Sequence, residues 1–305
     1  MPPESAPNPD LRPNTQPKPP PSPNPDPHPL IPEGINVSRT HPLADFGLML
    51  AGFVGLLVLV ILLAHLLGGV LVRFVPFATE AALLEELAPL GVVPATADQD
   101  HARHRAKTQS LQALADRLAA HMDLPPDIQV RIHYDPSDSA NAYATLGGNV
   151  VIYQGLLDRV STENALSMVV AHEIAHIKNR DPLLSLGRGM TTALALAALS
   201  GFGATETAST IAHLTSLSLL TRYSRAQEEA ADRAAAQALL AHYGHLGGAD
   251  EFLANMRGLE NGPLGRDFFR THPLTDRRIE RIAEFGRSHG PAELIALPPP
   301  LRKDP

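Results

Sequence analysis

The 305-residue chain contains no cysteine. It can therefore form no disulfide, and a thiolate is available neither as a nucleophile nor as a metal ligand. The absence is compatible with a reducing and with an oxidising compartment, so it does not decide where the protein works.

The chain also lacks an excess of basic residues. Its 25 lysines and arginines face 32 aspartates and glutamates, which gives a net charge of −7 and a pI near 6.0. A protein that holds nucleic acid by its phosphates needs a basic surface, and this composition provides none. We therefore expect no nucleic-acid partner.

Proline is concentrated at the N-terminus, where residues 1–32 hold 14 of the 29 prolines. Polar and charged residues separate them, so this segment cannot bury apolar surface, and an extended or disordered tail is expected over residues 1–45. A spacer is the simpler use of such a tail, and a ligand for an SH3-like domain is the alternative.

A long apolar run follows at residues 46–72, and its first 19 residues, Phe46–Ala64, contain no polar side chain. At about 1.5 Å per residue the run can cross a hydrocarbon layer of about 30 Å. It predicts one transmembrane helix, with a buried core helix as the alternative. A cleaved signal peptide fits poorly because about 45 residues precede the run.

The most informative motif is His172-Glu173-Ile174-Ala175-His176. Residues four apart share one face of a helix, so His172 and His176 can bind the same metal ion. Glu173 lies one step round the helix and can take a proton from a water that the metal activates. This is a zinc-protease signature, and residues 161–179 predict the helix that carries it. The alternative is a surface helix with two unrelated histidines.

A second helical run extends from Ser224 to Tyr243 and ends at Gly244. Glu228 and Asp232 lie one turn apart on it. Glu228 can supply the third metal ligand, while Asp232 can accept the outer N–H of a ligand histidine and fix its ring. Without the upstream motif, this string would be a solvated charged face.

Three separated motifs resemble family M48 of the zinc metallopeptidases. They are His172–His176 with Asn179-Arg180-Asp181, then Ser224-Arg225-x-x-Glu228-x-x-Ala231-Asp232, then Thr271-His272-Pro273 followed by Arg278-Ile279. The resemblance implies a gluzincin-type metalloprotease domain over residues 108–288, with an α+β, mainly helical fold and a small β-sheet. One transmembrane helix and a linker over residues 73–107 precede it, and residues 289–305 follow as a solvated tail.

The resemblance also implies one Zn²⁺ per chain, held by His172, His176 and Glu228, with Glu173 as general base and acid and Asp232 as the partner of a ligand histidine. His272 is implied to lie near the metal, where it could hydrogen-bond the oxyanion of the reaction. Taken alone, a histidine before proline would be a turn residue. Arg225 and Arg278 are expected to hold the ligand helix through ion pairs.

Substrate is expected to pair as an added strand with an exposed edge of the sheet. The β-rich run that includes Asn149, Val150, Val151 and Ile152 is the predicted edge. Farther along, residues 183–220 form an apolar region interrupted by polar residues, which favours two buried or membrane-apposed helices over a second span.

These inferences predict a zinc metalloendopeptidase, anchored in the inner membrane by one span, that hydrolyses unfolded or misfolded protein substrates in quality control. The catalytic domain is expected in the periplasm, although Arg39 and Arg73 flank the span symmetrically and decide nothing. The first rival is a membrane-tethered chaperone or adaptor that binds clients with little turnover; the intact Glu173 argues against it. A hydrolase of non-peptide bonds is the second.

Overall fold

The computed structural model describes residues 42–87, 102–189, 223–257, 262, 266–272, 276–287 and 293–302. The chain divides into two compact units, Met1–Gly52 and Phe53–Pro305. The predictions made for residues 1–41, and for most of the apolar region at 183–220, lie outside the described residues.

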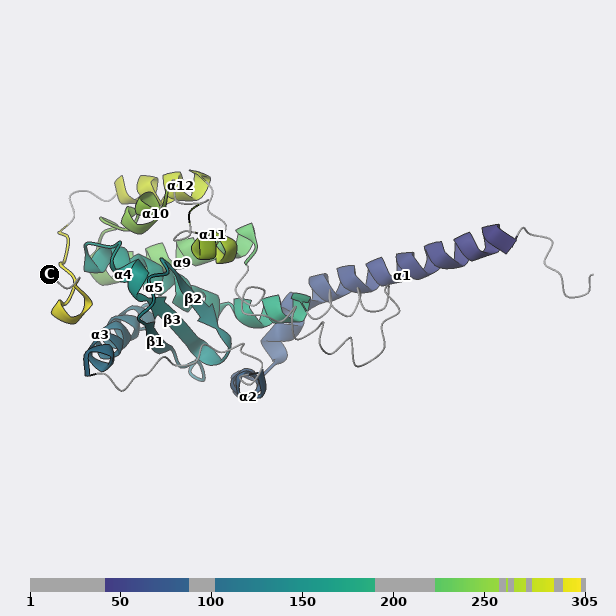
Figure 1. Cartoon of the computed structure of the whole chain (residues 1–305), viewed down its shortest axis with the longest axis horizontal. Helices are drawn as coiled ribbons and strands as arrows, with labels where there is room; N and C mark the ends of the chain where they lie inside the picture. Colours follow the sequence, from purple (N-terminus) through teal and green to yellow (C-terminus); the bar gives the residue numbers. More distant parts are fainter. Residues whose placement is uncertain are drawn as a thin grey trace, which may run out of the picture. The chain divides into compact units, whose positions relative to one another are not determined.

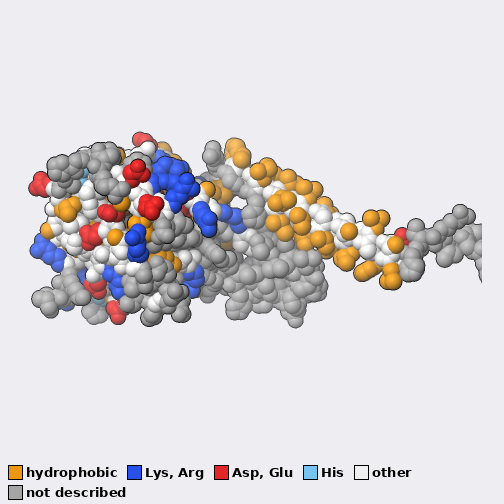
Figure 2. Space-filling view, turned by 90° about the horizontal axis from the view of Figure 1, so that it is seen from above, with side chains coloured by type: hydrophobic (Ala, Val, Ile, Leu, Met, Phe, Trp, Pro, Cys, Tyr) orange, Lys and Arg blue, Asp and Glu red, His pale blue; other side chains and the backbone are white. Residues whose placement is uncertain are grey.

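Helix α1, Pro42–Leu71, is built almost wholly from apolar residues. By length and composition, its part Leu43–Leu63 is long and apolar enough to cross a membrane, and it is the one such helix among the described residues. Most of its large apolar side chains are exposed along the helix (Figure 2). A lipid layer would remove this apolar surface from water. The prediction of a long apolar helix is confirmed.

The sheet has three strands in the order β1-β3-β2. β1 (Arg131–Asp135) runs parallel to β3 (Asn149–Tyr153), and β2 (Ala142–Thr145) runs antiparallel to it. The prediction that Asn149–Ile152 form an exposed edge is therefore wrong: β3 is paired on both sides, and β2 lies at the edge among the described strands. A tight turn, η3 (Leu146–Gly148), folds β3 back onto β2.

Helix α5, Glu163–Lys178, is the central element of the second unit. It begins where Thr162 accepts the N–H of Ala165, as a helix N-cap does. Every residue from Glu163 to Ile177 is buried, because α5 packs against the sheet, α3 (Ala102–Ala119) and α9 (Arg225–Tyr243) (Figure 1). A helix buried on all sides can place polar side chains in the interior if they are paired.

Helix α9 begins with a reciprocal capping box between Ser224 and Gln227 and ends at Gly244, whose φ of 76° suits a left-handed cap. Shorter helices in this part of the chain include α4 (Gln154–Leu157), α10 (Glu251–Met256), α11 (Arg266–Thr271) and α12 (Asp276–Arg287), and residues 181–189 are also helical. α10 packs on α5 and α12 on α9. The α+β, mainly helical fold is thus confirmed.

Two segments that the sequence predicted to be a linker and a solvated tail are partly built into the fold. After η1 (Val72–Phe74), helix α2 (Phe77–Leu87) packs against η3 and buries Phe77 and Glu80. At the other end, Leu297 and Leu301 are buried in the core, and Ala296 forms a β-bridge with Thr162. The sequence did not indicate this burial, because burial of a short segment depends on distant partners.

Candidate metal centre and active site

Four buried side chains converge at one point of the second unit. They are His172 and His176 from α5, Glu228 from α9, and His272, which directly follows α11. Each offers one nitrogen or oxygen atom, and these atoms all lie within 4.8 Å of one another. The fold therefore gathers groups that are up to 100 residues apart in the chain.

The two α5 histidines point the same ring nitrogen at the same carboxylate. Their Nε2 atoms are 3.0 Å apart. Nε2 of His172 lies 3.5 Å from Oε2 of Glu228, and Nε2 of His176 lies 3.5 Å from Oε1 of the same side chain. The helical spacing of four residues and the facing first turn of α9 produce this arrangement.

The opposite nitrogen of each ring is held by a carboxylate. Nδ1 of His172 lies 3.0 Å from Oδ1 of Asp232, and Nδ1 of His176 lies 2.8 Å from Oδ2 of Asp181. A carboxylate at Nδ1 holds the proton there, which leaves the Nε2 lone pair free to bind a metal.

Asp181 is a buried carboxylate of this centre to which the sequence reasoning gave no role. Helix α5 ends at Lys178 with Asn179 as its C-cap, and the φ of 59° at Arg180 turns the chain so that Asp181 reaches back to His176. The amide of Gln227, on α9, donates to the other oxygen of Asp181 at 2.6 Å. The available signal was the string Asn179-Arg180-Asp181 directly after the histidine motif.

Arg278 of α12 pairs with both carboxylates of α9. Its Nε and Nη2 donate to Asp232 at 2.7 and 2.8 Å, and its Nη1 lies 2.6 Å from Oε2 of Glu228. All three side chains are buried. Arg278 thus supplies the positive charge that two buried carboxylates need, as the sequence predicted for an arginine that holds the ligand helix.

These contacts set the charge state of the cluster. Burial favours a neutral Asp232, but the hydrogen bonds from Arg278 and His172 outweigh it and lower its pKa to about 2. Burial likewise opposes the charged form of Glu228, yet His272 and the hydrogen bonds from the histidines hold its pKa well below the ordinary value. Burial disfavours protonated His172, but Asp232 and Glu228 raise its pKa to about 10. Glu228 and Asp232 are therefore ionised at neutral pH, and the Glu228 carboxylate is available as a partner for a cation.

Glu173 sits beside this cluster and faces the sheet. Its Oε2 accepts the backbone N–H of Ala144 in β2 at 2.7 Å, and its Oε1 lies 3.4 Å from Nε2 of His272. The carbonyl of Ala144 accepts the hydroxyl of Tyr223 at 3.1 Å, and the Tyr223 ring stacks on His176 with centroids 3.8 Å apart. Tyr223, which precedes the cap of α9, was not identified from the sequence.

His272 bridges the two glutamates. Its Nδ1 lies 3.1 Å from Oε1 of Glu228, and its buried Nε2 makes no hydrogen bond within the described residues. The ring also stacks on Phe268 with centroids 5.3 Å apart. The structure therefore places His272 beside the proposed ligands, where the family resemblance implied it would lie.

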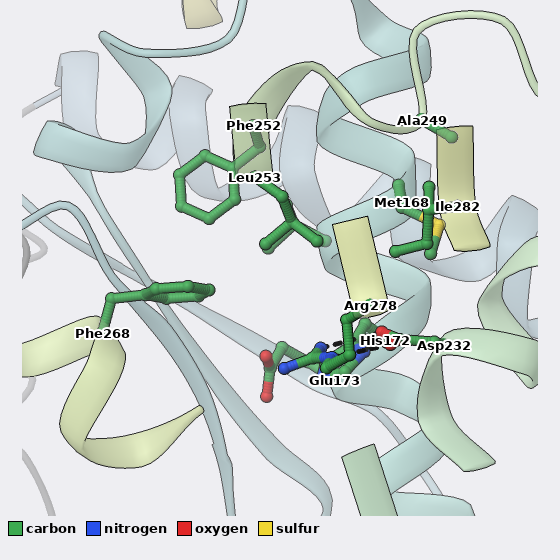
Figure 3. Close-up of a pocket in the computed structure, with 11 residues that line it drawn as sticks. Met168, His172, Glu173, Asp232, Ala249, Phe252, Leu253, Phe268, Arg278 and Ile282 are labelled. Carbon is green, nitrogen blue, oxygen red and sulfur yellow. Dashed lines mark hydrogen bonds and ion pairs between the residues drawn. The ribbon is translucent and has the colours of Figure 1, made fainter. Parts of the chain in front are cut away.

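A pocket opens next to His172 and Glu173 (Figure 3). It encloses about 340 Å³, including the part that is open to solvent. Apart from His172, Glu173, Asp232 and Arg278, its lining is apolar and comes from α5, α10, α11, α12 and the approach to α10: Met168, Val169, Ala249, Phe252, Leu253, Phe268 and Ile282. Such a lining suits an apolar side chain.

The donor set fits a divalent metal ion. It offers two imidazole nitrogens whose opposite nitrogens are already engaged, and a carboxylate whose pKa is strongly lowered. One ring nitrogen of His272 lies in the same group of atoms and adds a further buried donor. Histidine nitrogen and carboxylate oxygen are ligands that zinc prefers.

Comparison with known proteins places this centre in a family. Residues 105–285 match the sequence profile of Peptidase family M48. A "Protease HtpX homolog" of Salinibacter ruber is 31% identical over 217 residues, which cover 59% of this chain and 76% of the relative. One from Thermococcus sibiricus is 30% identical over 198 residues, covering 51% and 67%. A "Beta-barrel assembly-enhancing protease" of Yersinia pestis is 34% identical over 98 residues, only 19% of its length.

Proposed function

Because the chain belongs to peptidase family M48, we propose that it is a membrane-anchored zinc metalloendopeptidase that hydrolyses peptide bonds in unfolded or misfolded proteins. The family makes it a metallopeptidase, and the relatives named above are proteases. One observation carries the proposal: the carboxylate of Glu173 is held by Ala144 and lies 3.4 Å from Nε2 of His272, a member of the cluster with His172, His176 and Glu228. This is the place where a general base is needed.

The proposed ligands of one zinc ion per chain are His172, His176 and Glu228, with Asp232 and Asp181 holding the rings. When bound, zinc lowers the pKa of a water molecule towards neutrality and polarises the carbonyl of the scissile bond. The low pKa of Glu228 keeps this ligand ionised at neutral pH.

Glu173 acts first as general base and then as general acid. Its Oε2 is occupied by the N–H of Ala144, so Oε1 is the oxygen that takes a proton from the attacking water. As the carbon–nitrogen bond breaks, the same carboxyl group returns the proton to the leaving amine. His272 holds its Nδ1 towards Glu228 and has Nε2 left to donate to the oxyanion.

The substrate backbone is proposed to lie along β2 rather than along β3. β2 pairs with β3 on one side, and the N–H of Ala144 points away from that pairing to Glu173. The N–H and C=O of Ala144 are already paired with Glu173 and Tyr223, so an added peptide would use other outward backbone groups of this strand, beside the base and without being read by sequence. An apolar side chain next to the scissile bond would enter the pocket lined by Phe252, Leu253 and Phe268. Unfolded proteins expose such side chains.

α1 is proposed to anchor the chain in the inner membrane, with the peptidase domain in the periplasm. Support comes from the length and apolarity of α1 and from the relatives, one of which is named for enhancing the assembly of β-barrels. Protein quality control in the cell envelope would provide unfolded substrates at this location.

The test is cleavage of unfolded casein by the full chain in detergent micelles with zinc, beside the Glu173→Gln variant, with bound zinc counted in both. We expect about one zinc in each protein and a loss of turnover of at least about 100-fold in the variant, because general acid–base catalysis contributes about 10²–10⁴-fold. Equal cleavage by both proteins would refute the role of Glu173, and absence of zinc from both would refute the ligand set.

The alternative function is client binding with little or no turnover. One observation favours it: an atom of His272 lies within 4.8 Å of the ligand atoms of His172, His176 and Glu228, so a fourth donor could close the site. In that case the wild type would bind casein and zinc without cleaving, and His272→Ala would release activity. If His272 instead stabilises the oxyanion, the same variant loses turnover.

A further inference from the structure

Glu80, on helix α2, is a buried carboxylate outside the centre described above. Only 3% of its surface is exposed, whereas Glu85 on the same helix is exposed. Burial raises the pKa of Glu80, although Arg180 opposes the shift. A buried acid is costly unless its oxygens are paired, so its two contacts show what it holds in place.

Each oxygen of Glu80 binds a different part of the fold. Oε1 accepts the backbone N–H of Gly147 at 3.0 Å. Oε2 lies 2.5 Å from Nε of Arg180, whose Nη1 also donates to the carbonyl of Val75 at 3.1 Å. The guanidinium carbon of Arg180 lies 5.6 Å from the centre of the Phe77 ring. One side chain thus joins α2, the turn after β2 and the residue that ends α5.

The contact with Arg180 leads to a proposed metal ligand. Arg180 has a φ of 59°, a conformation that non-glycine residues rarely adopt, so it depends on its surroundings. The next residue, Asp181, holds Nδ1 of His176 at 2.8 Å. A change in the direction of the chain at Arg180 would therefore move the carboxylate that orients His176.

The contact with Gly147 leads to the general base. Gly147 follows β2, where the N–H of Ala144 holds Oε2 of Glu173 at 2.7 Å. α2 packs closely here, since a Cβ on Gly147 would lie 3.2 Å from Cα of Ala81. Glu80 therefore fixes the end of the strand that positions Glu173.

We propose that Glu80 is a positioning residue of the peptidase and that α2, the helix after the apolar α1, belongs to the catalytic domain. Through Arg180, this carboxylate maintains the Asp181–His176 contact. Through Gly147, it maintains the Ala144–Glu173 contact. The expected effect of Glu80 on catalysis rests on the proposed function, whereas its expected effect on the order of β2 and the following turn does not. It revises the predicted boundary, because residues 73–107 were expected to be a linker.

The test uses the full chain in detergent micelles. Glu80→Gln keeps the size of the side chain and an acceptor for Gly147 but removes the charge that pairs with Arg180; Glu80→Ala removes both contacts. Glu85→Gln on the exposed face of α2 is the matched control. With casein as substrate we expect kcat to fall about 10-fold in the first variant and about 100-fold in the second, because small displacements of catalytic groups cost this much. KM should stay within about twofold, and the control should match the wild type.

Two readouts separate positioning from a general loss of folding. Hydrogen exchange over residues 142–149, measured by mass spectrometry on the zinc-free protein, should be at least about 10-fold faster in Glu80→Ala and unchanged in Glu85→Gln. Zinc affinity, measured by competition with a chelator, should fall about 10-fold because the contact that orients His176 is loosened. In a double-mutant cycle with Arg180→Gln, the double variant should lose less kcat than the product of the losses in the two single variants.

The outcomes are distinct. If the wild type cleaves casein and Glu80→Ala has wild-type kcat and exchange, the positioning role is overturned. If Glu80→Ala only lowers the thermal midpoint while the folded protein keeps its kcat, Glu80 is a structural residue and the proposal fails. If the wild type cleaves nothing, the proposed function fails, and exchange over residues 142–149 still decides the role of Glu80.

Discussion

Nδ1 of His176 lies 2.8 Å from Oδ2 of Asp181, five residues farther along the same chain. The contact crosses the end of α5, which closes with Arg180 at a φ of 59°. His172 has its own carboxylate, Asp232, on a different helix. His176 is thus oriented by a carboxylate of its own helix–turn segment, itself held by Gln227 of α9, and His172 by a carboxylate of α9.

Replacing Asp181 by alanine should weaken zinc binding about 10- to 100-fold, because a carboxylate at Nδ1 fixes the ring and raises the basicity of Nε2. Competition with a fluorescent chelator measures the affinity. Asp138→Ala, at an exposed position, is the control and should bind zinc like the wild type. Equal affinities for the two variants would mean that Asp181 does not orient the ligand.

Replacing Arg278 by alanine should destabilise the zinc-free protein by about 3–5 kcal/mol, since Asp232 and Glu228 would remain buried without their counter-charge. Arg281 on the same helix pairs with Glu229 at 3.2 Å near the surface. Arg281→Ala should therefore cost no more than about 1 kcal/mol. Thermal unfolding followed by circular dichroism compares the two, and similar losses would contradict the role given to Arg278.

Replacing Ala249 by leucine should change the choice of substrate. Ala249 is buried and lines the pocket beside Glu173, so a larger side chain takes up space that an apolar substrate side chain would need. For peptides with leucine or phenylalanine next to the cleaved bond, kcat/KM should fall about 10-fold or more relative to peptides with alanine there. Ala254→Leu, exposed on α10, should leave the preference unchanged. An unaltered preference in Ala249→Leu would exclude this pocket as the subsite.

Replacing Gly148 by alanine should destabilise the sheet by about 2–5 kcal/mol. The residue has a φ of 78°, and an added Cβ would lie 2.0 Å from the carbonyl oxygen of Gln129, so strain and overlap add together. Gly187 lies in the helical stretch 181–189 with open space at its Cβ position, and alanine there should be neutral or stabilising by up to about 1 kcal/mol. Thermal unfolding of both variants checks the contrast.

The sequence predicted the helices that carry the site well, because their limits are set by local chemistry. Residues 161–179 became α5, Glu163–Lys178, with its cap at Thr162, and 224–243 became α9 between Ser224 and Gly244. The gathering of His172, His176, Glu228 and His272 also follows the motifs. Their roles in zinc binding and catalysis remain predictions.

What the sequence could not predict depends on contacts between distant residues. The β-rich run 149–153 indicates a strand but not its neighbours; in the fold β3 pairs with both β1 and β2 and is therefore central. The burial of Glu80 and Leu301 depends on partners far along the chain. Asp181 was missed because only the turn at Arg180 brings it back to His176.

The ligand helices α5 and α9 are separated by a long stretch of chain, and a metal held by His176 and Glu228 would join its ends. The joined residues are 52 positions apart, from 176 to 228. A covalent cross-link that closed a loop of this length would stabilise the folded chain by about 4 kcal/mol, mainly by restricting the unfolded state. Because the chain has no cysteine, a bound metal would be the cross-link available to it. A chelator that removed the metal would then lower the stability of the folded chain as well as stop catalysis.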